Sequence, residues 1–90
     1  MNLADKITIP AQVMARDVGG ETVILNLETG IYFGLDPVGA RIWQLLSDGS
    51  TLSGTCDALL AEFEASREDI ERDVLGLVET LQAQRLVEIA

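Results

Sequence analysis

Hydrophobic and polar residues alternate in the first third of the chain, with the two-residue period of β-strands. Three segments show this character: residues 13–18, 22–27 and 31–35. A Gly-Gly pair at 19–20 separates the first two segments, and Glu-Thr-Gly at 28–30 separates the last two. Such short glycine-containing links are typical of turns between antiparallel strands. The pattern therefore predicts a three-stranded antiparallel sheet.

The loop at 28–30 also predicts a register for the second hairpin. A three-residue loop with a left-handed glycine at its end places Leu27 opposite Ile31. One face of the sheet is then wholly apolar and carries Val23, Leu25, Leu27, Ile31, Phe33 and Leu35. The other face carries Ile24, Asn26, Tyr32 and Gly34. We expect the first face to pack on the core and Tyr32 to be partly exposed.

Apolar residues in the rest of the chain recur every three or four positions, which is typical of amphipathic helices. In the first helix Val38, Ile42, Leu45 and Leu46 form such a stripe, which we expect to pack on the core. Capping and turn residues delimit three helices. The first runs from Pro37, after Asp36, to Asp48, the second starts near Ser50 or Thr51, and the third runs from Ser66 to about Gln84. The apolar run at 86–89 could form a short terminal strand or simply pack against the body of the domain.

Strands that precede helices, instead of alternating with them, indicate an α+β fold. We expect a winged-helix-like domain: a three-stranded antiparallel sheet within about 7–35, followed by a three-helix bundle within about 37–84. Ninety residues are enough for a single domain, residues 1–90.

The net charge argues against several classes of partner. Fifteen acidic residues against six basic ones give a net charge of −9. A winged-helix DNA-binding regulator is a less favoured alternative, because it needs a basic recognition helix and here the second and third helices are rich in acids. A polybasic membrane contact is excluded for the same reason. No segment resembles a signal peptide or a membrane span, so we expect a cytoplasmic protein.

Catalytic chemistry has little support in this composition. The chain lacks histidine, and its one cysteine, Cys56, lies in the helical phase of the core. We therefore expect no enzyme activity, no catalytic residue, no metal site and no cofactor. Six acids cluster in the segment 62–73, at Glu62, Glu64, Glu68, Asp69, Glu71 and Asp73. They could form a patch that receives a basic peptide, or simply a solvated helix start that complements the helix dipole.

The third strand offers the sharpest hypothesis about binding. Edge strands are usually protected by charges, prolines or a covering element, and the segment 31–35 contains no charge and no proline. If this strand lies at the edge, an extended peptide could add to it as a further strand. The third helix would form the opposite wall of a groove.

Several segments resemble PqqD-like proteins. The run GETVILNLETGIYFGLD at 20–36 is similar to their strand–turn–strand signature, and VGARIWQLL at 38–46 is similar to their first helix. IERDV at 70–74 and the ending through Leu86 and Val87 are similar to their last helix and C-terminus. This resemblance covers most of residues 13–87.

The resemblance implies a RiPP recognition element, a domain that binds the leader segment of a ribosomally synthesised precursor peptide. The leader would lie as an antiparallel strand against the third strand, beside the third helix, and the domain would be a monomer. Matching positions imply a peptide-binding set of Ile31, Tyr32, Phe33, Gly34, Leu35, Asp69, Arg72, Asp73 and Gly76. At Gly76, close packing against another helix is an equally good explanation for the glycine.

The segment NLETGIYF most resembles the stand-alone leader-binding subunit of lasso peptide biosynthesis. That branch implies two partners, a transglutaminase-like leader peptidase and an asparagine synthetase-like cyclase. The alternative branch is the pyrroloquinoline quinone (PQQ) peptide chaperone, whose partner is a radical SAM enzyme. In that branch a Pro-Glu-Gly-type turn is expected where this chain has Glu-Thr-Gly.

Overall fold

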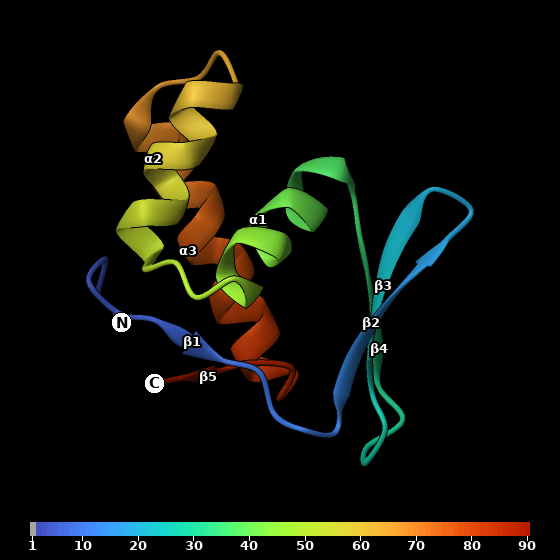
Figure 1. The fold of residues 1–90 in the computed structure, drawn as a ribbon. Coiled ribbons are helices and arrows are strands. Elements are labelled where there is room, and N and C mark those ends of the chain that lie inside the picture. Colours follow the sequence, from blue (N-terminus) through green and yellow to red (C-terminus); the bar gives the residue numbers. More distant parts are fainter. Residues whose placement is uncertain (1) are drawn as a thin grey trace.

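A computed structural model describes residues 2–90 (Figure 1). The central sheet has the strand order β2-β3-β4, formed by Val13–Val18, Glu21–Asn26 and Tyr32–Leu35. Both pairings are antiparallel. The helices α1 (Pro37–Ser47), α2 (Leu52–Glu62) and α3 (Arg67–Ala83) follow in sequence. The predicted α+β fold, a three-stranded antiparallel sheet followed by three helices, is confirmed.

The predicted register of the second hairpin is wrong by one residue. Phe33 lies opposite Ile24, and Tyr32 lies opposite Leu25. The core face of the sheet therefore carries Ile24, which is fully buried, together with Phe33 and Leu35. Val23 and Leu25 lie on the opposite face instead, and Leu27 is 61% exposed in the turn. Tyr32 is exposed as predicted, but Ile24 does not share its face.

Asn26 explains the shift in register. Its backbone N–H donates to the carbonyl of Ile31, so the loop between the strands has four residues instead of three. Its side-chain Oδ1 accepts the N–H groups of Glu28 and Thr29 at 2.9 and 3.1 Å. Gly30 has a φ of +76°, so the predicted left-handed glycine is present although the loop is longer.

The helix boundaries follow the predicted capping residues. Asp36, Thr51 and Ser66 are the N-caps, and each side chain accepts the N–H of the residue three positions further on. Pro37 occupies the first position of α1, where its missing N–H costs nothing. Local chemistry therefore determines where each helix starts.

A second small sheet joins the two ends of the chain. The strand β1 (Ile7–Thr8) pairs antiparallel with β5 (Glu88–Ile89). Of the two possibilities for the terminal segment, the strand is correct. Leu86 and Val87, just before it, are buried with Ile7 in the core.

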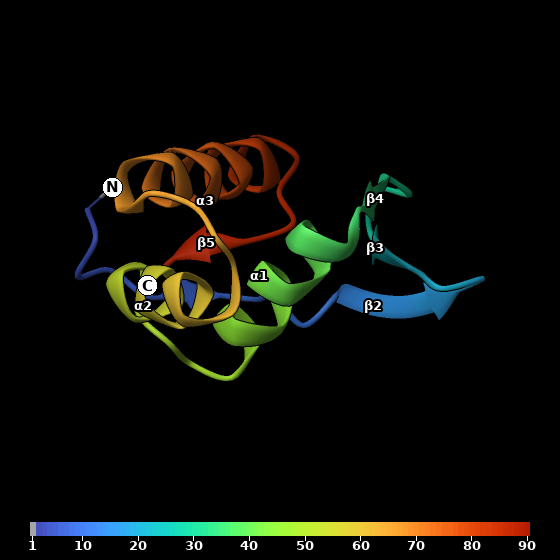
Figure 2. The same cartoon turned by 90° about the horizontal axis from the view of Figure 1, so that it is seen from above.

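Figure 2 shows the central sheet extending to one side of the helical bundle, with α1 next to it. Much of β2 is consequently exposed, and only Val13 of that strand is buried. The core lies between the three helices, the terminal strands and the near part of the sheet. None of the helices among residues 2–90 is long and apolar enough to cross a membrane.

Candidate functional site

The strand β4 is an edge of the central sheet, as the sequence hypothesis required. It pairs with β3 on one side, and no other strand within residues 2–90 pairs with it. The strand starts at Tyr32, because Ile31 belongs to the loop closure. Gly34 has open space where a side chain would lie. An extended chain could therefore approach this edge without a steric barrier at Gly34.

A hollow of about 500 Å³ begins directly after β4, between the start of α1 and the middle of α3. Its lining comes from these two helices and from the cap that precedes α1: Asp36, Val38, Gly39, Ile42, Arg72, Asp73, Gly76 and Leu77. A Cβ at Gly39 would lie 3.3 Å from Leu35. The end of β4 and the start of the hollow are therefore in direct contact.

The polar wall of this hollow is an ion-paired arginine on α3. Arg72 Nη2 lies 3.0 Å from Asp69 Oδ1, and its Nε lies 3.9 Å from Asp73 Oδ1. The Arg72 side chain is still 70% exposed, so its remaining N–H groups can donate to a ligand. An arginine oriented in this way suits a backbone carbonyl or a carboxylate.

Gly76 lies one turn after Arg72, and it faces open space. No atom lies within 4 Å of the position its Cβ would occupy. Close helix packing therefore does not explain this glycine. A helix-interior glycine costs about 1 kcal/mol relative to alanine, and its benefit here is room in the hollow.

The predicted peptide-binding residues fall into two groups. Arg72, Asp73 and Gly76 line the hollow together, whereas Asp69 acts behind them as the ion-pair partner of Arg72. Within the strand segment, Leu35 and Phe33 face the core, and Phe33 is only partly buried. Ile31 is 39% exposed in the loop closure, and Tyr32 and Gly34 face away from α1.

The sequence prediction missed the α1 side of the hollow. Val38 and Ile42 were expected only as core residues of the helical stripe. In the structure Val38 is 41% exposed and lines the hollow, while Ile42 forms its floor from the buried side. The sequence did contain a sign that Val38 is exposed. It lies one residue after the proline that starts α1, and side chains at the end of a helix have few neighbours.

A second, more apolar hollow of about 290 Å³ adjoins the first. The two share Val38, Ile42 and Asp73, and the second continues toward the link between α2 and α3. Its other lining residues are Leu59, Phe63, Glu64, Ala65 and Ile70. Phe63 is 40% exposed here. Together the hollows form one continuous groove from the end of β4 across the start of α3.

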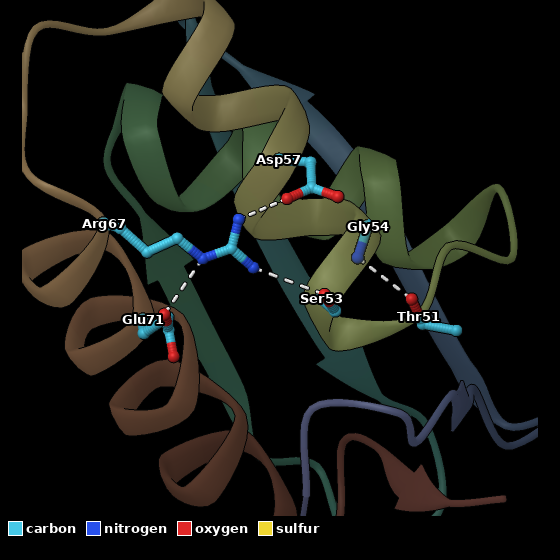
Figure 3. Close-up of polar contacts among 6 residues, drawn as sticks. All are labelled: Thr51, Ser53, Gly54, Asp57, Arg67 and Glu71. Atoms are coloured by element: carbon cyan, nitrogen blue, oxygen red, sulfur yellow. Dashed lines mark hydrogen bonds and ion pairs between the residues drawn. The ribbon is translucent and has the colours of Figure 1, made fainter.

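Arg67, the first residue of α3, fixes that helix against α2 (Figure 3). Its guanidinium forms an ion pair with Asp57 and donates to Glu71 at 3.0 Å and to Ser53 at 3.3 Å. The hydrogen bonds that Arg67 donates to Asp57 and Glu71 raise its pKa above the usual value. This cluster positions the start of α3, and therefore the residues that line the groove.

The remaining candidates for chemistry are structural. Cys56 is fully buried, and desolvation raises the pKa of its thiol, so it stays protonated at neutral pH. Among residues 2–90, no group of three or more acidic, cysteine or histidine side chains could hold a metal ion. In the acidic cluster, Glu62 pairs with Arg41 and Glu71 with Arg67.

Comparison with known proteins agrees with this geometry. The family model for coenzyme PQQ synthesis protein D (PqqD) matches residues 21–87. The chain belongs to the PqqD family. Among solved structures, TbiB1 in complex with the TbiA(beta) leader peptide is 40% identical, with a TM-score of 0.83 over 89% of this chain and 93% of that one. Lasso peptide synthetase B1 complexed with the leader peptide is 27% identical, with a TM-score of 0.85 over 91% and 96%. A comparison with curated proteins found no match.

Proposed function

We propose that this PqqD-family domain binds the leader segment of a ribosomally synthesised precursor peptide and delivers it to lasso peptide maturation enzymes. The observation that carries the proposal is the open edge of β4, which leads directly into the groove between α1 and α3. It is supported by two similar proteins solved with leader peptides, one of them 40% identical.

The mode of binding follows from the edge. A leader that adds antiparallel to β4 exchanges backbone hydrogen bonds with it, and these provide affinity without regard to sequence. Its residues beside Leu35 then continue into the groove, where Arg72 can donate to a carbonyl and Gly76 leaves room for a side chain. The groove side chains provide the specificity.

In this function the domain is an adaptor and not a catalyst. Its proposed partners are a transglutaminase-like leader peptidase and an asparagine synthetase-like cyclase, both in the cytoplasm. The second candidate function is that of a PQQ peptide chaperone for a radical SAM enzyme, which is favoured by the description of the matching family model. The two candidates share the binding site and differ in the peptide.

Fluorescence polarisation with a labelled TbiA(beta) leader tests the proposal, because TbiB1 is the more identical of the two neighbours. Arg72→Ala removes the donor, and Gly76→Glu fills the open space with a charged side chain. We expect each to weaken leader binding at least tenfold without lowering the melting temperature, since both positions are exposed.

Matched controls are Lys6→Ala, which removes an exposed cation far from the groove, and Thr80→Glu, one turn after Gly76 on α3. Both should bind as the wild type does. Equal affinity in the Arg72 and Gly76 variants would refute the site. If the TbiA(beta) leader fails to bind and a PQQ precursor peptide binds, the second candidate is correct.

A further inference from the structure

The face of the central sheet that is turned away from α1 is mostly apolar and uncovered. We call it the outer face; it consists of Met14, Arg16, Val18, Glu21, Val23, Leu25, Tyr32 and Gly34. Met14 is 40% exposed, Val18 is 59% exposed and Tyr32 is 73% exposed. In Figures 1 and 2 no helix lies against this side of the sheet. An apolar face of this kind usually marks an interaction site.

The outer face is hollowed and not flat. A hollow of about 170 Å³ lies among Arg16, Val18, Val23, Leu25 and Tyr32, and its walls are entirely apolar. Arg16 therefore contributes carbon atoms to this lining, and its guanidinium is not part of it. This shape fits an apolar side chain of a partner inserted between Arg16 and Tyr32.

Charge favours a different protein over a second copy of this chain. Each copy carries a net charge of −9, so two copies repel each other. Arg41, Arg67 and Arg72 are all ion-paired, whereas Arg16 forms no ion pair with residues 2–90. A partner with a carboxylate among apolar side chains would complement Arg16 and the hollow around it.

The chain direction of the bound leader indicates which partner lies next to this face. A strand antiparallel to β4 starts beside Leu35 and ends beside Tyr32, so the C-terminal end of the leader leaves next to the 27–30 turn. The row Met14–Leu25–Tyr32 of the outer face lies at this same end. An enzyme that cuts after the leader must work near this point.

Resting on the proposed function, we propose that the outer face is the docking surface for the leader peptidase. The bound leader would widen this face by one strand, because every second leader side chain points to the same side as Tyr32 and Gly34. The peptidase would therefore contact the domain and the leader together and bind the complex more tightly than the free domain.

The experiment measures binding of the full chain, saturated with leader, to an immobilised transglutaminase-like leader peptidase from the same genome. Met14→Glu introduces a charge on β2, two strands from the leader edge, and Val18→Gln removes an exposed apolar side chain from the hollow. Ala61→Glu on α2 adds the same charge as Met14→Glu at an exposed position that lines neither the groove nor the hollow of the outer face. Fluorescence polarisation reports leader affinity for every variant.

We expect Met14→Glu and Val18→Gln to weaken peptidase binding at least tenfold, while leader affinity stays within twofold of the wild type and Ala61→Glu changes neither. Peptidase binding by the Met14 and Val18 variants equal to that of Ala61→Glu, or no peptidase binding by the wild type, would overturn the docking surface even though leader binding remains. Loss of the proposed function itself would be seen separately, as absence of leader binding by the wild type.

Discussion

Asn26 is a buried polar side chain whose hydrogen bonds connect three parts of the chain. Its Oδ1 accepts two N–H groups of the 27–30 loop, and its Nδ2 donates to the carbonyl of Arg85 at 3.1 Å. Arg85 has a φ of +59°, in the turn that follows α3. The single side chain thus attaches the hairpin beside β4 to the C-terminal end of the bundle.

We expect Asn26→Ala to lower the free energy of unfolding by about 2–4 kcal/mol, because it leaves several partly buried groups without partners. Urea denaturation measures this loss. Asn26→Asp is the informative companion: it keeps both acceptor bonds but loses the donor to Arg85 and buries a charge, so it should also destabilise. A change within about 0.5 kcal/mol for Asn26→Ala, the range of ordinary surface substitutions, would contradict this role.

The same residue limits what the sequence could predict about the sheet. Alternation correctly identified the three strands and the exposure of Tyr32. The register depended on loop length, and the loop length depends on the side chain of Asn26 bonding to Glu28, Thr29 and the distant Arg85. The three-residue loop predicted from Glu-Thr-Gly placed Asn26 on the face away from the core, and that prediction was wrong.

At the level of elements, α1 and α2 are joined across their surfaces by a bidentate ion pair. Arg41 Nε and Nη2 donate to the two carboxylate oxygens of Glu62 at 2.8 and 2.7 Å. Hydrogen bonding from Arg41 lowers the pKa of Glu62 below its usual value. The folded state therefore holds the ionised form more tightly than the unfolded chain does.

The sign of the pH dependence follows. The pair contributes its full stability above the pKa of glutamate in the unfolded chain, and this contribution is lost as the pH falls through the lower pKa of the folded state. We expect Arg41→Met to return the pKa of Glu62 toward its usual value. Less stability is then lost when the pH falls through this pKa. Carbon-detected NMR titration of the Glu62 carboxyl in the variant and in the wild type measures the change; an unchanged Glu62 titration would refute the assignment.

Elements differ in how far the sequence could predict them. Helix starts were predictable because each depends on residues three positions apart, as with Asp36 and Gly39. The edge position of β4 follows from the order of a three-stranded meander, and its lack of charge and proline indicated only that a further strand could add there. The pairing of β1 with β5 joins residues some eighty positions apart and has no local signal. The α1 side of the groove was missed because Val38 continues a core stripe.

At the scale of the whole molecule, the N-terminal residues 3–9 contact both the start of α2 and the C-terminal end of the chain. They do so although the family match starts only at residue 21. The carbonyls of Leu3 and Asp5 accept the N–H groups of Ser53 and Leu52 at the start of α2. The carbonyl of Lys6 accepts the N–H of Ala90, and Ile7 is buried in the core. Residues 3–9 therefore connect the start of α2 to the C-terminus.

A chain shortened to residues 10–90 should accordingly fold less stably, by about 3–5 kcal/mol, from the loss of one buried isoleucine, partly buried neighbours and several hydrogen bonds. Equilibrium urea unfolding compares the two chains, and Ile7→Ala, expected to cost about 2–4 kcal/mol, separates side-chain burial from strand pairing.

The groove and the β4 edge lie outside this segment, so leader affinity should be unchanged wherever the shortened chain is still folded. A shortened chain as stable as the full one would mean that the terminal sheet does not stabilise the domain. Lower leader affinity at full folding would mean that the terminal sheet positions the groove as well.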